Sequence, residues 1–217
     1  MSRARLDLPR KLPTQARARA TVDAILRATA HILRTQGWDA CNTNAVAKRA
    51  GVSIGSLYQY FPSKEALVAA LTEQHAQASL AVLVDAIARA PTEPRSVDET
   101  VRHYIRAMVR LHAADPKLHR VLVEQVPQLR GGRAVLQRVS QESARLVRGW
   151  LETQRAQLRA VDLDVATYVL VTSVEAVTHL QVLRRPERLD EDLLVAELTE
   201  LVLGYLGVGR ARGRARR

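Results

Sequence analysis

The sequence has little of what cross-linked or secreted folds depend on. Its 217 residues contain one cysteine, Cys41, so an intrachain disulfide is excluded and a reducing cytosol is expected. A lone cysteine could serve as a redox sensor, but we interpret Cys41 as a small buried hydrophobe beside Trp38, since free cysteine usually packs in that way. The N-terminus is basic without an apolar run, and we expect no secretory signal.

Long apolar runs and catalytic motifs are also missing from the sequence. Residues 165–183 form the most apolar stretch, but Glu175, His179 and Gln181 interrupt it, which predicts a buried helix and no membrane span. No cysteine pair, His-x-x-x-His spacing, glycine-rich phosphate loop or nucleophile–base–acid set stands out. We therefore expect no catalytic residues, no metal site and no cofactor. An all-helical enzyme stays the weaker alternative, which a turnover screen would test.

Positive charge is unevenly distributed along the chain. The formal net charge is +11, with +8 in residues 1–64, −2 in residues 65–207 and +5 in residues 208–217. A basic segment joined to a nearly neutral body is typical of proteins in which one module meets phosphate and the remainder does something else. The asymmetry predicts that the first segment contacts nucleic acid.

Helical periodicity dominates the chain, and no alternating strand pattern or hairpin signal stands out. The sequence therefore predicts an all-α fold of about nine helices. We expect a flexible basic arm at 1–16, a DNA-binding domain at 17–64, a ligand-binding and dimerisation domain at 65–208, and a basic disordered tail at 209–217. Expected helices include 17–36, ended by Gly37, and 133–160, and Ser63 and Asp115 are expected to cap two others.

Residues 43–64 have the pattern of a helix-turn-helix motif. Two short helical segments flank Gly51, which supplies the backbone freedom of a tight turn. Ser53 is placed to cap the second segment, and Leu57 is its inward anchor. The remaining side chains of that segment are mostly small or polar, so the helix could lie close to the bases in a DNA groove.

The motif resembles the DNA-binding signature of the tetracycline-repressor (TetR) family. The resemblance rests on Ala47-x-x-Ala50-Gly51-Val52-Ser53-x-Gly55-x-Leu57-Tyr58-x-Tyr60-Phe61-x-x-Lys64-x-x-Leu67 and extends back through residues 24–43. It covers about the first 70 residues, a third of the chain. It implies a three-helix DNA-reading head followed by a helical ligand-binding and dimerisation body, and a function as a dimeric, ligand-responsive transcriptional regulator, usually a repressor.

Residues of the motif divide into expected phosphate contacts and expected base contacts. Thr43 is expected to cap the first helix and to meet a phosphate there. Lys64 is expected in the first turn of a helix, where the helix dipole disfavours a positive charge. A phosphate partner would explain its presence there. The expected DNA-binding residues are Thr43, Asn44, Ser53, Ile54, Gly55, Ser56, Tyr58, Gln59, Tyr60 and Lys64.

The body is expected to hold a small apolar or amphipathic effector. Polar and aromatic groups within its apolar stripes indicate a pocket with a few polar anchors, although single histidines on helices are more often ordinary core or surface groups. The candidate ligand-binding residues are His103, Tyr104, Met108, His112, Gln125, Trp150, Glu175 and His179.

The last two helices are expected to form a homodimer interface. One DNA-reading module buries too little surface for useful specificity, so the partner should be double-stranded DNA with an inverted repeat. The candidate interface residues are Leu194, Leu198, Leu201, Val202 and Tyr205. The alternative is a constitutive or architectural DNA-binding protein without an effector, although charge-based binding does not need so large a body.

Overall fold

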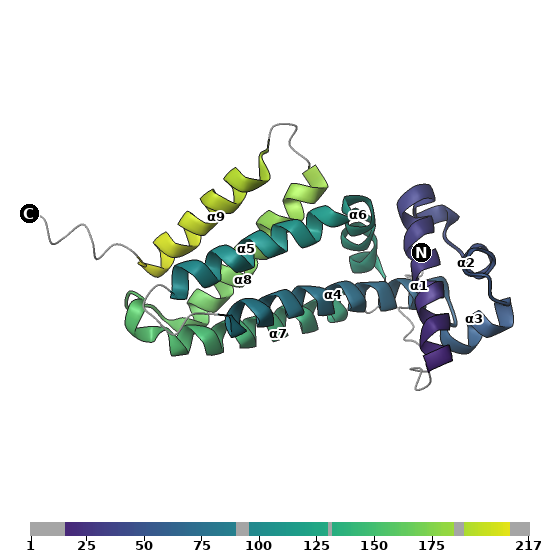
Figure 1. Ribbon diagram of the computed structural model, residues 1–217, viewed down its shortest axis with the longest axis horizontal. Helices are drawn as coiled ribbons and strands as arrows, with labels where there is room; N and C mark the ends of the chain where they lie inside the picture. The colour runs from purple at the N-terminus through teal and green to yellow at the C-terminus, as the bar shows by residue number, and fades with distance from the viewer. Residues whose placement is uncertain (1–15, 90–95, 130–131, 185–188, 209–217) are drawn as a thin grey trace, which may run out of the picture. The chain divides into compact units, whose positions relative to one another are not determined.

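The computed structural model describes residues 16–89, 96–129, 132–184 and 189–208, and these residues are helical without a strand (Figure 1). The all-α prediction is confirmed. The expected arm and tail, residues 1–16 and 209–217, lie outside the described residues except for Ala16. In chain order the described elements are α1 (Ala16–Ala40), α2 (Thr43–Ala50), α3 (Ile54–Tyr60), α4 (Lys64–Ala88), α5 (Ser96–Ala114), α6 (Pro116–Gln125), η1 (Val126–Gln128), α7 (Gly132–Thr153), η2 (Arg155–Gln157), α8 (Leu163–Arg184) and α9 (Glu191–Leu206).

Two of the expected helix ends differ from those observed. Gly37 was expected to end the first helix, but it forms a kink with φ 82° and helical structure resumes as far as Ala40. The helix expected at 133–160 ends at Thr153, and a 3₁₀ turn with an extended Leu158 follows it. No proline or glycine marks the end at Thr153, and apolar side chains continue at helical spacing beyond it. Nothing in the sequence therefore indicated that the helix ends there.

The described residues form two compact units. The N-terminal unit comprises residues 1–77 and 115–137, and the C-terminal unit comprises residues 78–114 and 138–217. This division follows packing, whereas the sequence expectation placed a boundary at residue 64. That functional boundary between a head and a body stays a prediction.

In the N-terminal unit, α6 packs against the three-helix motif at the start of the chain. Leu122 and Val126 join the core that contains Ile32, Leu57 and Phe61. Arg34 on α1 and Asp115 at the start of α6 form an ion pair with an N–O distance of 3.0 Å. As expected, Asp115 caps α6, where its carboxylate accepts from the amide of Leu118, and Pro116 follows as the first helical residue.

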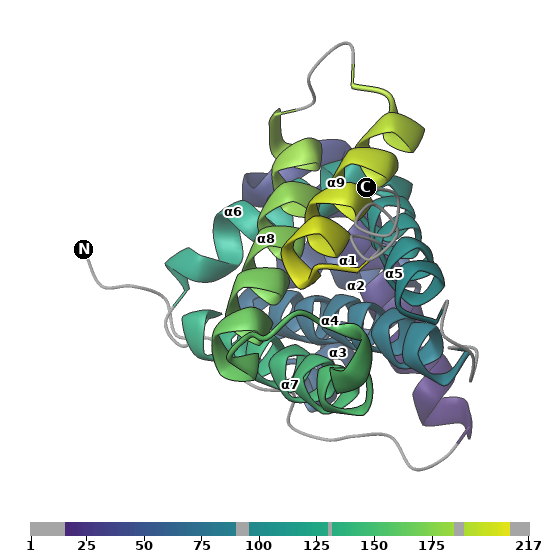
Figure 2. The ribbon, with the colours of Figure 1, turned by 90° about the vertical axis from the view of Figure 1, so that its left-hand side faces the viewer.

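In the C-terminal unit, α5, α8 and α9 lie side by side and share one apolar core (Figure 2). The core includes Ile105 of α5, Leu151 of α7, Val174 of α8 and Leu206 of α9. Asp190 caps the N-terminus of α9 by accepting from the amides of Asp192 and Leu193. At the other end of α9, Arg159 donates from its backbone and side chain to the carbonyls of Leu206 and Tyr205, and these bonds satisfy groups that a helix end leaves without partners.

By length and composition alone, α4 and α8 are apolar enough to cross a membrane. Core helices of soluble proteins meet the same criterion. On α8, Ala166, Leu170 and Val174 are buried in the core of the C-terminal unit. This packing buries one side of α8, whereas Val165 and Tyr168 are exposed, so the expectation of a buried helix is met only in part.

A glycine exchange tests the turn between α2 and α3. Gly51 has φ 68°, and an L side chain pays about 1–2 kcal/mol in that conformation. Gly51→Ala should therefore lower the free energy of unfolding by about 1–2 kcal/mol. The control is Gly149→Ala in α7, where no atom crowds the added methyl group, and it should raise that free energy by about 0.5–1 kcal/mol. Chemical denaturation measures both, and equal effects at the two positions would contradict the turn's role.

Candidate functional site

Side-chain and backbone caps fix the α2–turn–α3 motif. Asn42 caps α2, because its side-chain oxygen accepts from the amide of Ala45 at 2.9 Å. The expected cap, Thr43, is instead the first helical residue, and this corrects the prediction. Ser53 caps α3 as expected by accepting from the amide of Ser56 at 3.0 Å. Gly51 occupies the left-handed conformation between the two helices.

The outer face of α3 is polar and accessible, while its inner face is held by one fully buried residue. Leu57 is 0% exposed. By contrast, Ile54, Gly55, Tyr58 and Gln59 are exposed. The structure therefore leaves most of the expected base-contacting side chains of α3 free of the core, and Asn44 on α2 is exposed too. Ser56 and Tyr60 are half-buried.

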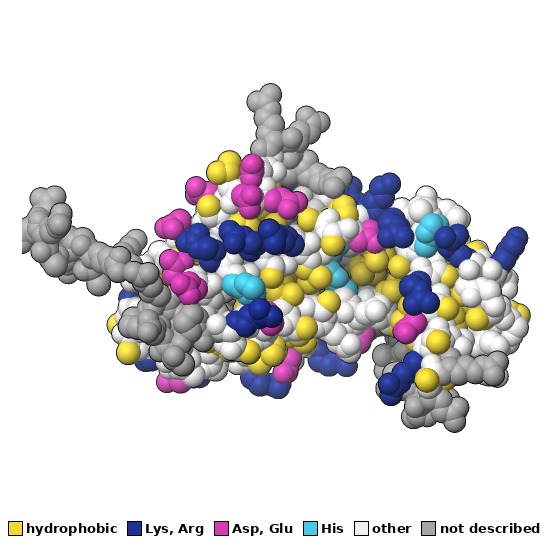
Figure 3. Space-filling view, in the orientation of Figure 1, with side chains coloured by type: hydrophobic (Ala, Val, Ile, Leu, Met, Phe, Trp, Pro, Cys, Tyr) yellow, Lys and Arg dark blue, Asp and Glu magenta, His cyan; other side chains and the backbone are white. Residues whose placement is uncertain are grey.

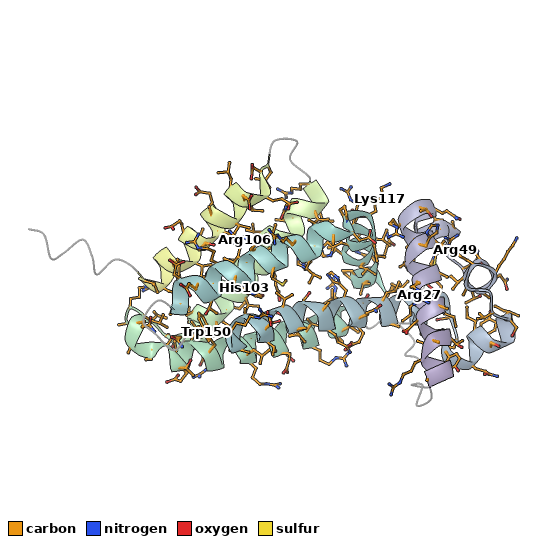
Figure 4. All side chains as sticks on the ribbon, in the orientation of Figure 1. Arg27, Arg49, His103, Arg106, Lys117 and Trp150 are labelled. Carbon is orange, nitrogen blue, oxygen red and sulfur yellow. The ribbon has the colours of Figure 1, made fainter. Side chains whose placement is uncertain are left out.

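Two of the expected phosphate contacts touch each other. The hydroxyls of Thr43 on α2 and Tyr58 on α3 lie 3.1 Å apart in a hydrogen bond. This bond joins the N-terminal end of α2 to the exposed face of α3. A helix N-terminus favours anions, so Thr43 stands where a phosphate oxygen would be attracted. Arg27 on α1 and Arg49 on α2 add exposed cationic side chains to the same unit (Figure 4).

Lys64 has partners inside the N-terminal unit. Its ammonium group donates to the carbonyl of Trp38 at 2.5 Å and lies 3.8 Å from the centre of the Trp38 ring. Partial burial lowers the pKa of Lys64 from its ordinary value. The contacts with Trp38 give this lysine a structural role, so a phosphate is not needed to explain its place in the first turn of α4, and the expected phosphate contact stays a prediction. An ammonium group has three donors, so a phosphate contact stays possible alongside this one.

Cys41 is buried beside Trp38, as expected. Its amide donates to the carbonyl of Trp38 at 3.2 Å, and its side chain is in the core of the N-terminal unit. Burial raises the pKa of the Cys41 thiol to about 11. Because thiolate is the reactive form, this thiol is unsuited to redox sensing near neutral pH.

A cavity of about 50 Å³ lies within the C-terminal unit. Two of the expected ligand-binding residues, Tyr104 of α5 and Trp150 of α7, line it. The sequence analysis missed the others, since apolar periodicity shows that a side chain is buried but does not show which buried side chains border a gap. The remaining lining residues are Leu83, Ala86, Ile87, Thr100, Val101, Ile105, Val147, Leu170, Val171, Val174 and Val202.

The other expected ligand-binding residues do not border this cavity. His103 is on the surface of α5 (Figure 4), where its ring lies 3.4 Å from a carboxylate oxygen of Asp85. Gln125 belongs to the N-terminal unit. Met108 and His112 are buried, and His112 meets His179 edge to face at 4.7 Å between ring centres. None of these residues lines the cavity described here, and their assignment to a ligand stays a prediction.

Glu175 forms a polar group close to one wall of the cavity. Burial raises the pKa of Glu175, and a side-chain hydrogen bond with Ser140 partly offsets that effect. Burial likewise raises the pKa of Tyr104 well above its ordinary value, with the charge of Glu175 adding to the rise. The phenol of Tyr104 therefore stays neutral at physiological pH.

The expected dimer residues divide into core and surface positions. Leu198 and Val202 are only 4% and 3% exposed and pack in the core of the C-terminal unit, so they are not surface residues of α9. Leu194 and Tyr205 are half-buried, and Leu201 is 58% exposed. The five residues form a broad stripe around α9, so some of them face the core of their own unit while others face outward. Other exposed apolar side chains on these two helices are Val165, Tyr168 and Leu180 of α8 and Leu193 of α9.

Charge on the face of the C-terminal unit in Figure 3 is arranged in rows. Lys and Arg side chains gather over α5, where Arg106 is exposed, and acidic side chains lie beside them over α9. The mixed signs contrast with the basic N-terminal segment. This face therefore gives no indication of a second phosphate-binding surface.

A family model described as the bacterial regulatory proteins of the tetR family matches residues 25–71. A second, described as the C-terminal domain of tetracyclin repressor-like proteins, matches residues 96–206, about half of the chain. The first match covers α2, α3 and most of α1. The second covers all of the helices that line the cavity except α4. No curated protein matches this chain.

Solved structures share the fold over most of the chain. FadR from Bacillus halodurans, a fatty acid degradation regulator, is 22% identical with a TM-score of 0.70, over 91% of this chain and 98% of that one. FadR from Bacillus subtilis, solved in complex with stearoyl-CoA, is 20% identical with a TM-score of 0.68, over 84% and 98%. PfmR from Thermus thermophilus, a TetR family transcriptional regulator, is 18% identical with a TM-score of 0.63, over 84% and 98%. At these identities the likeness concerns the fold.

The buried carboxyl of Glu175 predicts a pH-dependent gain in stability for Glu175→Gln. Because burial raises the pKa of the folded carboxyl above its unfolded value of 4.5, folding of the wild type is penalised at pH values above 4.5, including neutral pH. Glu175→Gln should raise the melting temperature at pH 7. That gain should disappear as the pH falls through the folded pKa to below 4.5, where the carboxyl is protonated in both the folded and the unfolded chain. Glu197→Gln, at an exposed position of α9, is the control and should change little, and a gain for Glu175→Gln that persisted at about pH 3 would contradict this account.

Proposed function

The chain belongs to the TetR family of DNA-binding transcriptional regulators, and from that premise we propose that it is a homodimeric repressor which a small apolar or amphipathic effector releases from an inverted-repeat operator. It is a regulator rather than an enzyme, and its family binds DNA through the helix-turn-helix motif and small molecules through the C-terminal domain. We propose the cytoplasm as its location, since it acts on DNA.

One observation carries the DNA-reading role of α3. Leu57 is the one fully buried residue of this helix, while Ile54, Gly55 and Gln59 are exposed on its other side. A helix in a major groove needs close backbone approach and side chains that reach base edges. Gly55 would permit the approach, Ile54 would meet a thymine methyl, and Gln59 or Asn44 would pair with adenine. Thr43, Ser53, Ser56, Tyr58, Tyr60 and Lys64 would position the helix on the phosphates or support it.

The C-terminal unit supports response to a ligand. It contains a partly open cavity lined almost wholly by apolar side chains, as is typical of small-molecule sites. The FadR from Bacillus subtilis, which this chain resembles in fold, was solved with stearoyl-CoA, an amphipathic molecule. We propose that a smaller effector acts here, because 50 Å³ does not accommodate a long acyl chain without rearrangement.

The helix α4 provides a covalent path between effector and DNA. Its first residue, Lys64, contacts Trp38 of the reading head, and Leu83, Ala86 and Ile87 near its other end line the cavity. An effector that binds better to one conformation of the body shifts the population toward that conformation. We propose that the shifted state spaces the two heads of the dimer so that they no longer fit successive major grooves.

Selection from a random DNA library tests the function as a whole. The full chain should enrich an inverted repeat whose half-site centres lie about one helical turn or a small multiple apart. Protein that bound all library sequences equally would point to an architectural role and against this proposal. Operator affinity is then measured with and without lipophilic compounds. An effector should change the free energy of operator binding by about 1–3 kcal/mol, the usual coupling between two sites.

Two exchanges in the head should affect DNA binding in different ways. Lys64→Met should weaken binding to all sequences alike and reduce the slope of log K against log salt by about one unit. Gln59→Ala should leave that slope unchanged and alter which base is preferred at one position of each half-site. Fluorescence anisotropy at several salt concentrations, on variants whose melting temperature matches the wild type, measures both. An unchanged salt slope for Lys64→Met would remove Lys64 from the phosphate contacts.

An exposed leucine on α9 tests the dimer. Leu201→Arg places a charge on the apolar surface of α9. In a two-fold dimer both protomers bring this charge to the same interface. The dimer should weaken by at least about a hundredfold, since an unpaired charge in an apolar interface costs several kcal/mol. Val84→Arg, at a valine of α4 that is also exposed, should leave the dimer intact. Sedimentation velocity separates the two, and a Leu201→Arg dimer of wild-type affinity would exclude this part of α9 from the interface.

A further inference from the structure

Buried threonines in this protein usually donate to their own helix, and Thr100 does not. In a helix, a threonine hydroxyl can reach the carbonyl four residues earlier. Thr100 is 5% exposed, and its hydroxyl has no hydrogen-bond partner among the described residues. Thr167 is the second such exception. The buried threonines that do bond to the carbonyl four residues earlier, at 2.6–2.9 Å, are Thr29, Thr72, Thr178 and Thr199.

A second donor without a partner stands on the wall of the same cavity. Trp150 of α7 is 9% exposed and lines the cavity together with Thr100 of α5. Its indole nitrogen is buried and has no acceptor among the described residues. An indole N–H can only donate, and a buried donor without an acceptor costs free energy. Both atoms are covered in this conformation, so they lie beneath the cavity lining to which their residues belong. Two such groups behind one lining are unusual, since buried polar groups are nearly always paired.

The rest of the wall restricts what can satisfy these donors. Among the described residues that line the cavity, none carries a formal charge, and apart from Tyr104 the others are aliphatic. The two donors require an acceptor, and an anionic acceptor would find no cation in this lining and would be repelled by the carboxylate of Glu175, which lies close enough to Tyr104 to raise the pKa of its phenol. The matching partner is therefore an uncharged molecule with an acceptor, such as the oxygen of a ketone, ester or amide.

We propose that the cavity binds an uncharged, mainly apolar molecule whose carbonyl-type oxygen accepts hydrogen bonds from the indole N–H of Trp150 and the hydroxyl of Thr100. Binding itself depends only on the cavity, whereas the role of that molecule as the effector rests on the proposed function. An engineered cavity of roughly 150 Å³ takes up benzene, so a cavity of about 50 Å³ must widen for a ligand of that size. Such a ligand must separate α5 from α7 or α8, and this separation would uncover the hydroxyl of Thr100 and the indole nitrogen of Trp150. The ligand therefore binds the widened conformation better than the closed one.

Pairs of small probes that differ only in the acceptor test the proposal directly. Cyclopentanone and methylenecyclopentane are one pair, and acetophenone and α-methylstyrene are a larger pair, with a C=CH₂ group in place of C=O. The chain has two tryptophans, so the indole N–H region of an ¹H–¹⁵N spectrum holds two signals, and Trp150→Phe assigns them. Each ketone should shift the Trp150 indole proton downfield, and each alkene should not. The signal of Trp38, in the N-terminal unit, should stay in place.

Matched variants test whether the two donors select the acceptor. For each probe pair, the ratio of the alkene Kd to the ketone Kd should fall by about tenfold in the double variant Thr100→Val, Trp150→Phe. Thr167→Val is the control: it removes the other buried hydroxyl without a partner, at a position that does not line the cavity, and should leave the ratio unchanged. The threonine-to-valine exchanges keep the shape of the side chain, whereas Trp150→Phe removes part of the indole and widens the cavity for both members of a probe pair. The ratio of the two Kd values therefore carries the test, and melting temperatures verify that each variant folds.

Two outcomes would overturn the proposal. If no probe of either pair shifted a signal of the C-terminal unit, the cavity would not be a site for small neutral molecules. If ketone and alkene bound with the same ratio in the wild type and the double variant, water or the protein itself would satisfy the two donors. Ketone binding with the predicted selectivity but no effect on operator affinity would support the site and would instead refute the effector role under the proposed function.

Discussion

The burial of Leu57 and Phe61 holds a helix that could not stand alone. With seven residues, α3 is far shorter than the roughly 12–15 residues at which isolated helices become even marginally stable. Both side chains are almost wholly buried in the core of the N-terminal unit, and the Ser53 cap and the left-handed Gly51 set the direction in which α3 starts. Because these contacts use only the inner face, the outer face of α3 is free to contact DNA.

The same core ties distant parts of the sequence to this short helix. Through Leu122 and Val126, α6 and the turn after it join that core, and Asp115 pairs with Arg34 across 81 positions of sequence. The reading head is thus stabilised by a segment that the sequence alone assigned to the body. Proximity in the folded unit, rather than order along the chain, decides which helices stabilise α3.

Local features of the sequence predicted local features of the structure well. Ser53, Asp115 and Pro116 have their expected roles at helix ends because caps depend on a few neighbouring atoms. Longer-range assignments failed where helical periodicity alone was used. It showed that Leu198 and Val202 face inward, but could not show that they face their own unit instead of a second chain. Likewise the partner of Lys64, Trp38, is 26 residues away and no spacing rule identifies it.

The solitary, deeply buried Cys41 makes this chain convenient for labelling. Burial keeps its thiol protonated and covered, so maleimide reagents should not react with it at neutral pH. A cysteine introduced on the exposed surface of α3 or α9 would then be the only reactive thiol in an otherwise native sequence. Spin or fluorescent labels at one such position report the separation of two copies within an assembly, and they do so without a cysteine-free background that would disturb the core beside Trp38.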